Sequence, residues 1–194
     1  MNRRSILMML VAACTFGLAA CDFGNVDQGR TIAFDSEKRE VTMVQDVKHD
    51  QQHPDYSGAV VTYKLPADPK ETGPEPVAGQ RLKLDLDKKI VVIYNPTAKA
   101  IETVNIELTD VQKEIGAQSE LVKGKKFPVI DKGAATVTTY SPRQKVLATF
   151  KVPADKMELP DSVWEAGDEV RIYYKEKGQA ARFMNISKTN IFKK

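Results

Sequence analysis

The amino-acid sequence predicts an all-β fold, and three observations support this prediction. From residue 30 onward, β-branched and aromatic residues alternate with polar residues over short segments, as in Val104, Ile106 and Leu108 on one face of an expected strand. Glycine, proline, asparagine and aspartate interrupt these segments every few positions, which is typical of turns between strands. Only residues 109–115 favour a helix, because Thr109 and Gln112 have the spacing of a capping box.

The alternation places the expected strands in a regular series separated by polar turn segments. In chain order they are Thr31–Phe34, Glu40–Val47, Ala59–Leu65, Arg81–Leu86, Lys89–Tyr94, Thr103–Leu108, Lys126–Ile130, Thr136–Tyr140, Val146–Val152, Glu169–Tyr174 and Ala180–Ile186. Two hairpin turns are expected, at Asp35-Ser36-Glu37-Lys38 and at Lys175-Glu176-Lys177-Gly178. Aromatic residues at strand positions are expected in the core, namely Tyr63, Tyr94, Phe150 and Phe183.

An apparent internal repeat organises these strands. Three pairs of segments match in the same order along the chain: Val41-Thr42 with Val137-Thr138, Val60–Asp68 with Leu147–Asp155, and Ala78–Leu84 with Ala166–Ile172. We interpret this order as a duplication, although similar strand-loop-strand chemistry also recurs in all-β proteins generally. Duplication gives a first β-rich repeat at residues 30–115 and a second at 116–194. The expected architecture is two tandem small OB or SH3-like barrels, or one duplicated β-sandwich.

The first twenty residues have the character of an export signal. Arg3 and Arg4 give a basic start, residues 6–18 form an apolar run, and Leu18-Ala19-Ala20-Cys21 follows with small residues before a thiol. These last four residues resemble the lipobox of bacterial lipoproteins. The resemblance implies diacylglycerol on Cys21, cleavage between Ala20 and Cys21, and acylation of the new amino terminus. An ordinary secretory signal with an incidental cysteine is the alternative.

The segment after the signal predicts a short connection to a membrane. Residues 21–29 are polar and contain glycine, so we expect a lipidated tether that places the folded part on the periplasmic face of the membrane. Asp22 resembles the signal that keeps lipoproteins of enteric bacteria in the inner membrane. The inner membrane is therefore favoured over the outer membrane. The expected partners are the membrane itself, through lipid on Cys21, and a protein of the cell envelope.

Composition argues against nucleic-acid binding and against disulfide bonds, and it allows an apolar core. The chain has 29 basic and 26 acidic residues, and removal of the signal with Arg3 and Arg4 leaves a net charge near +1. This balance argues against nucleic-acid binding, which favours a strong basic excess on one face. The only other cysteine, Cys14, lies within the signal, so no disulfide is expected. With 42% hydrophobic residues, the mature chain can form an apolar core.

One loop carries both histidines of the chain. His49, Asp50, His53 and Asp55 are candidate metal ligands, because imidazole and carboxylate groups at this spacing can surround a divalent ion. Pro54 disfavours the helix that would place both imidazoles on one face, so a solvated loop is the alternative interpretation.

The sequence favours a non-enzymatic binding or scaffold role at the cell envelope. No catalytic motif is recognisable, and no cofactor is expected. Two alternatives remain open, which are a metal- or small-ligand-binding lipoprotein that uses the His49–His53 loop, and an envelope enzyme of unrecognised type. Paired buried carboxylates in a cleft would favour the enzyme.

Overall fold

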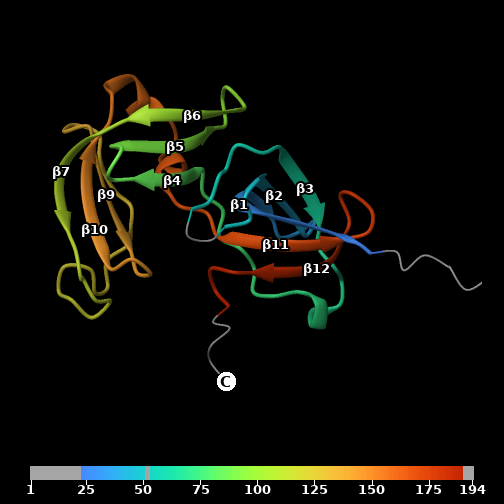
Figure 1. Cartoon of the computed structure of the whole chain (residues 1–194). Helices are drawn as coiled ribbons and strands as arrows, with labels where there is room; N and C mark the ends of the chain where they lie inside the picture. Colours follow the sequence, from blue (N-terminus) through green and yellow to red (C-terminus); the bar gives the residue numbers. More distant parts are fainter. Residues whose placement is uncertain (1–22, 51–52, 190–194) are drawn as a thin grey trace, which may run out of the picture.

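The computed structural model describes residues 23–50 and 53–189, and within them the fold is all-β, as expected. These residues form twelve strands and three short 3-10 helices, and the strands assemble into three antiparallel sheets. The sheets build two lobes that lie side by side (Figure 1). In the part described, no helix is long and apolar enough to cross a membrane.

The first lobe is a five-stranded sheet with the order β12-β11-β1-β2-β3. One face of this sheet is apolar because its strands alternate, and it forms a core around Val41, Tyr63 and Ile172, none of which has exposed surface. The strands are β1 (Asn25–Asp35), β2 (Glu40–Gln45), β3 (Val60–Lys64), β11 (Glu169–Tyr174) and β12 (Ala180–Asn185). A 3-10 helix, η1 (Pro69–Glu71), follows β3.

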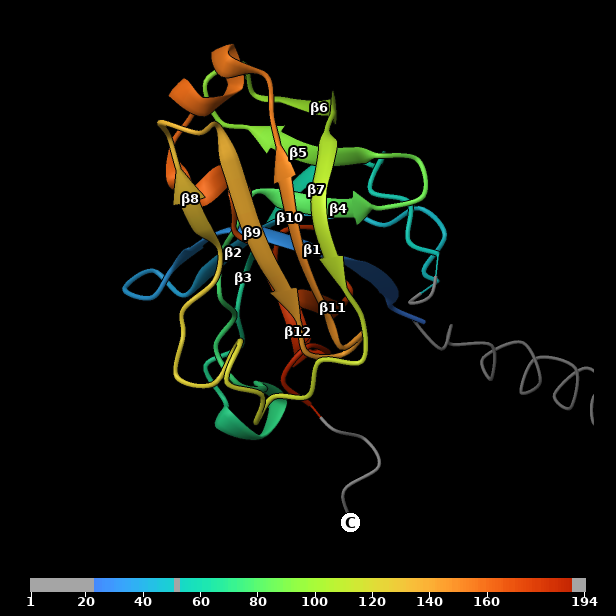
Figure 2. The ribbon, with the colours of Figure 1, turned by 90° about the vertical axis from the view of Figure 1, so that its left-hand side faces the viewer.

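The second lobe contains a three-stranded and a four-stranded sheet that share one core. In Figure 2 the four-stranded sheet, with the order β7-β10-β9-β8, faces the viewer. The three-stranded sheet consists of β4 (Arg81–Asp85), β5 (Ile90–Asn95) and β6 (Ala100–Asn105). The four-stranded sheet consists of β7 (Glu107–Gln112), β8 (Val129–Asp131), β9 (Thr136–Ser141) and β10 (Val146–Lys151).

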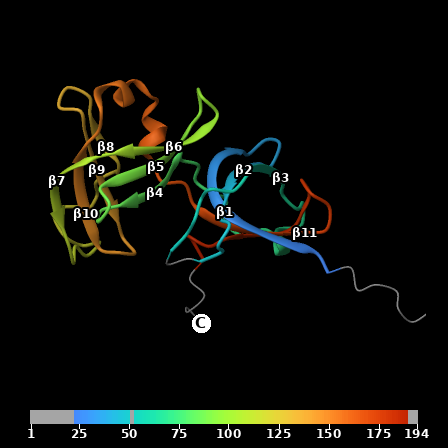
Figure 3. The ribbon, with the colours of Figure 1, turned by 45° about the horizontal axis from the view of Figure 1, so that its top comes forward.

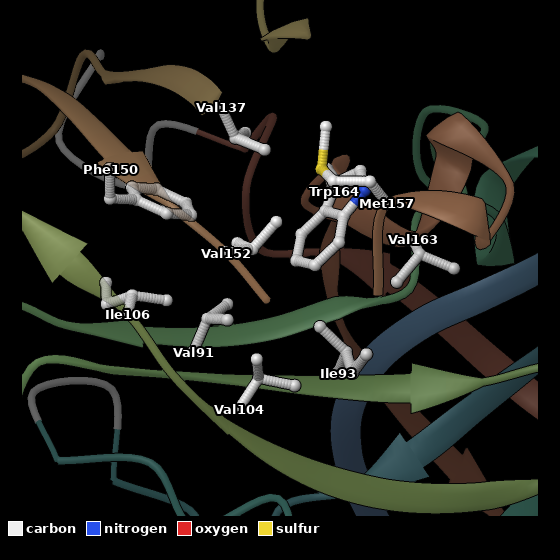
Figure 4. Packing of buried hydrophobic residues seen from close by; sticks show 10 residues of the cluster. All are labelled: Val91, Ile93, Val104, Ile106, Val137, Phe150, Val152, Met157, Val163 and Trp164. Carbon is white, nitrogen blue, oxygen red and sulfur yellow. The ribbon is translucent and has the colours of Figure 1, made fainter. Parts of the chain in front are cut away.

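The core of the second lobe lies between these sheets (Figure 4). Val91 and Ile93 of β5 pack in one cluster with Phe150 of β10. The 3-10 helices η2 (Ala154–Glu158) and η3 (Asp161–Trp164) add Met157 and Trp164, and the indole of Trp164 is 1% exposed. The only tryptophan of the chain is therefore a core residue.

The helix expected at residues 109–115 is wrong, because most of this segment belongs to β7. The chain passes from β6 through Ile106 into β7 and thereby leaves the three-stranded sheet for the four-stranded one. In β7, Leu108 lies opposite Phe150 and Val111 opposite Ala148. A helix of about two turns is marginal in water. The ladder with β10 bonds the same backbone and leaves its apolar side chains half-buried.

Five hairpins share one type of turn, in which the residue just before the second strand has a positive φ. A side-chain oxygen of the last residue of the first strand accepts a backbone N–H three positions later, as Asp35 does from Lys38. The same residues that interrupt the sequence pattern thus form the turns. The residues that accept are Asp35, Asp85, Asn95, Asp131 and Ser141, and those with positive φ are Arg39, Lys89, Lys99, Ala135 and Lys145.

The expected barrels are not present, because none of the three sheets closes. In the first lobe β3 and β12 are the two edges of the sheet. Lys64 of β3 bonds to the turn after β11, where its N–H donates to the carbonyl of Gly178 at 2.9 Å, and no ladder joins β3 to β12. The first lobe also combines residues 25–64 with residues 169–185, so its sheet joins strands from both sides of the expected boundary at 115/116.

The matching segments do share local geometry. Val41 lies opposite Tyr63 as Val137 lies opposite Phe150, and both rings are fully buried. The neighbouring threonine pairs, Thr42 with Thr62 and Thr138 with Thr149, each have hydroxyls 2.9 Å apart. However, β3 is an edge strand whereas β10 lies between β7 and β9. The surroundings therefore differ, and a duplication is not shown.

The chain crosses between the lobes twice, in opposite directions, and the two crossings touch. Residues 65–80 lead from β3 in the first lobe to β4 in the second, and residues 152–168 lead from β10 back to β11. Gln80 and Ala166 form a bridge where the crossings meet. A Cβ added to Gly167 would lie 1.8 Å from the carbonyl oxygen of Thr31, so only glycine fits there.

A small apolar cluster joins the two lobes. Figure 3 shows the lobes from another side. Ile32, Val44 and Tyr56 from the first lobe pack in this cluster with Leu82 of β4. The register between β1 and β2 shifts between Thr31 and Ala33, next to Ile32.

Candidate functional site at the junction of the lobes

Charged and polar side chains gather on the face of β1 beside this junction. Gln28 and Arg30 share one face of β1, and their partners across the ladder with β11 are Arg171 and Glu169. Asp46 follows β2 and donates its backbone N–H to the carbonyl of Gln28. We use the name junction cluster for Gln28, Arg30, Asp46, Tyr56, Arg81, Glu169 and Arg171.

Gln28 connects an acidic and a basic side chain within the cluster. Its amide nitrogen donates to Oε1 of Glu169 at 2.7 Å, and its amide oxygen accepts from Nη2 of Arg171 at 2.7 Å. Gln28 has no exposed surface and Glu169 is 5% exposed, whereas Arg171 is exposed. Burial raises the pKa of Glu169, and the charge of Arg30 acts in the opposite direction.

Arg30 holds the cluster against the crossing chain and the loop after β2. Its Nη1 donates to the carbonyl of Gly167 at 3.2 Å, and its Nη2 donates to the hydroxyl of Tyr56 at 3.1 Å. The guanidinium carbon also lies 5.1 Å from the centre of the Tyr56 ring, which gives a cation–π contact. Burial raises the pKa of the Tyr56 hydroxyl.

Asp46 shapes the loop after β2 from a fully buried position. Its Oδ1 accepts the backbone N–H groups of Lys48 at 3.0 Å and Asp55 at 2.8 Å. Its charge lies close enough to Glu169 to raise the pKa of that carboxyl further. Its Oδ2 is buried and has no hydrogen-bond partner among the described residues.

Arg81 differs from the other arginines of the cluster because it has no ion-pair or hydrogen-bond partner for its side chain among the described residues. The residue is half-buried at the start of β4. Burial lowers the pKa of Arg81 to about 10, and the like charge of Arg30 contributes to this shift. The cluster thus supplies a cationic group that the described protein atoms do not neutralise.

The histidine loop does not bring its candidate metal ligands together. Nδ1 of His53 lies 3.3 Å from Oδ2 of Asp50, and Asp55 instead faces Lys48 at 3.9 Å. His49 is exposed, with a positive φ. Among residues 23–50 and 53–189, no three histidine, cysteine, aspartate or glutamate side chains form a group that could hold a metal ion.

The expected lipidation and sorting residues, Ala20, Cys21 and Asp22, lie outside the described residues. The expected tether is nevertheless shorter than residues 21–29. β1 already begins at Asn25, and Asp27, Gln28 and Gly29 are buried. The reason is that residues 25–30 pair with β11, which lies far away in sequence. Only Phe23 and Gly24 precede the sheet within the described chain.

The junction cluster was missed by the sequence interpretation, and one signal could have indicated it. Gln28, Arg30 and Ile32 occupy every second position of a continuous β pattern and therefore share one face, although the sequence interpretation assigns residues 21–29 to a tether. Polar residues at apolar positions of a strand indicate a buried polar network.

Comparison with known proteins gives one family. Residues 22–194 match the family described as a domain of unknown function (DUF4881). No curated protein and no solved structure matches the chain.

Proposed function

Because the chain belongs to the DUF4881 family, whose description states no activity, we propose a function from its own residues. The protein is a lipid-anchored protein of the bacterial cell envelope, with a non-enzymatic binding or scaffold role on the periplasmic face of the membrane. Its partners are the bilayer, through lipid on Cys21, and an envelope component. Asp22 favours the inner membrane.

The single observation that carries this proposal is the sequence Leu18-Ala19-Ala20-Cys21 after an apolar run. The start of β1 four residues after Cys21 determines how close to the membrane the first lobe would lie. Four extended residues span roughly 13–14 Å. The backbone N–H of Gly24 donates to the Tyr173 hydroxyl at 3.3 Å, so the chain is already held by the first lobe at this point. A lipidated Cys21 would therefore keep the first lobe next to the bilayer.

This arrangement gives the lobes different roles. Tyr174 at the end of β11 lies opposite Asn25, so this end of the first lobe faces the anchor. The second lobe lies beyond the junction, away from the start of β1 (Figure 1). It would be presented to partners in the periplasm, and the junction would lie between the membrane-proximal and membrane-distal parts.

The carboxylates of the junction favour binding over catalysis. Asp46 and Glu169 are buried, and the charge of Asp46 acts on Glu169, which is a pattern that would favour an enzyme. However, Asp46 has no exposed surface and uses Oδ1 to hold a loop, and Glu169 accepts from Gln28. A general acid or base must reach its substrate. Both carboxylates are better suited to structural roles, Asp46 in holding the loop after β2 and Glu169 in fixing Gln28.

Fatty-acid labelling tests the anchor. Cells that express the full chain are grown with a clickable palmitate analogue, and label and membrane association are measured for the wild type and for Cys21→Ala. The control is Cys14→Ala, which removes the other cysteine inside the expected signal. We expect label in the wild type and in Cys14→Ala and loss of label in Cys21→Ala. An unlabelled wild-type protein in the soluble fraction would contradict the proposal.

A further inference from the structure

We propose that Arg81, together with Arg30, binds a small oxyanion, a carboxylate or phosphate group, at the junction of the lobes. The ligand group would lie at the start of β4, beside the two crossing segments. This inference concerns what the junction binds and does not depend on lipidation of Cys21.

The first argument is the missing counter-charge of Arg81. Buried or half-buried cations in proteins are normally paired, since removing a charge from water without a partner costs free energy. Arg182, by comparison, pairs with the carboxylate of Glu71 at 2.6 Å. Arg81 has no such partner among the described residues. A bound anion would supply the counter-charge that Arg81 lacks.

The second argument is the neighbour of Arg81. Arg30 is close enough for its charge to act on Arg81, and two cations in a half-buried place repel each other. An oxyanion near both guanidinium groups would remove the repulsion. Guanidinium groups bind carboxylate and phosphate oxygens with two parallel hydrogen bonds, which favours this ligand chemistry.

The third argument is the shared backbone position of the two arginines. Arg81 donates its backbone N–H to the carbonyl of Glu165 at 2.8 Å and forms a bridge with Ala166. Nη1 of Arg30 donates to the carbonyl of the next residue, Gly167, at 3.2 Å. Both arginines therefore lie at the same short segment of the crossing chain, residues 165–167.

The junction also limits the size of the ligand, and Arg81 remains accessible from solvent. Arg81 is half-buried, and its unpaired side-chain nitrogens keep some exposed surface, so its guanidinium is in contact with solvent. A Cβ on Gly79 would lie 2.5 Å from the carbonyl oxygen of Glu165, which shows how closely the two crossings pack next to Arg81. The site therefore suits a small group more than a bulky one.

Thermal unfolding in the presence of anions tests the proposal. The full-length protein in nonionic detergent is titrated with sodium phosphate and, separately, with sodium acetate, while sodium chloride keeps the ionic strength constant. We expect Tm to rise with the logarithm of the concentration of at least one of the two anions, by about 5–10 °C at a hundredfold excess over Kd. A response to phosphate alone, or to acetate alone, identifies which oxyanion the site prefers.

Three variants separate the site from general salt effects. Arg81→Gln should fold with a Tm close to that of the wild type in chloride, because it removes an unpaired charge, and it should lose the response. Arg81→Lys keeps the charge without the planar fork and should show a weaker response. Arg182→Gln, which removes an exposed paired arginine, should respond as the wild type does. The proposal is overturned if the wild type shows no response, or if Arg81→Gln responds equally.

Discussion

Gly167 is the position at which the crossing of the two lobes can be tested most sharply. In Gly167→Ala the added Cβ would lie 1.8 Å from the carbonyl oxygen of Thr31 and 2.9 Å from that of Gly79. Both obstacles are backbone atoms, so no side-chain rotation can relieve the contact. The chain at residue 167 or β1 must therefore move.

The cost follows from the hydrogen bonds that such a movement would break. The N–H of Thr31 donates to the carbonyl of Asp168 at 2.9 Å, and Gly79 donates to the carbonyl of Thr31 at 3.1 Å. Each bond contributes about 0.5–1.5 kcal/mol, and overpacking adds about 1–3 kcal/mol. We expect Gly167→Ala to lower the free energy of unfolding by about 2–6 kcal/mol.

Urea unfolding followed by circular dichroism measures this loss. The matched control is Gly116→Ala, because no atom lies within 4 Å of the Cβ it would add. That variant should be neutral or more stable by up to about 1 kcal/mol, through reduced freedom of the unfolded chain. If Gly167→Ala unfolds within about 0.5 kcal/mol of the wild type, the close crossing is not a feature of the protein in solution.

Three further outcomes are expected. Phe150→Ala and Tyr63→Ala each remove a fully buried ring and should each lower the free energy of unfolding by about 3–5 kcal/mol in urea titrations; a loss under about 1 kcal/mol for either would contradict its burial. Burial raises the pKa of Glu169, so the folded protein holds the proton of this carboxyl more tightly than the unfolded chain does. The stability gained from that proton is fully present below about pH 4.3 and is lost as pH rises through the folded pKa. Stability curves of the wild type and Glu169→Gln should thus diverge as pH rises from about 4.3, with the wild type losing more, and parallel curves would refute this. The protein should melt at nearly the same temperature with and without EDTA, because the described part of the histidine loop forms no ligand group, and a large drop would reveal a structural metal.

The strands and turns could be predicted because their signals are local. Asp35, Asn95 and Ser141 each end a strand and accept a backbone N–H within the following turn, so a few neighbouring residues determine the hairpin. The alternation of apolar residues, as in Val41 and Met43, likewise identifies a strand with one buried face.

The errors arose where distant segments determine the structure. Residues 109–115 have a local helical signal, but pairing with β10 overrides it. The start of β1 looks like a polar tether because its partner, β11, comes some 140 residues later, as the separation of 141 between Gln28 and Glu169 illustrates. The same distance hides the junction cluster, because a sequence pattern cannot say which strands become neighbours. The repeated glycines at 79 and 167 marked its place, since each allows a close crossing of the chain.

The mass of the mature amino-terminal peptide tests the central claim most directly. The protein is isolated from membranes of cells that express the full chain, digested with trypsin, and analysed by mass spectrometry. A peptide that begins at Cys21 and carries diacylglycerol and an N-acyl chain is the predicted result. A mature chain that begins elsewhere, or a Cys21 with an unmodified thiol, would contradict the claim that this protein is anchored by lipid.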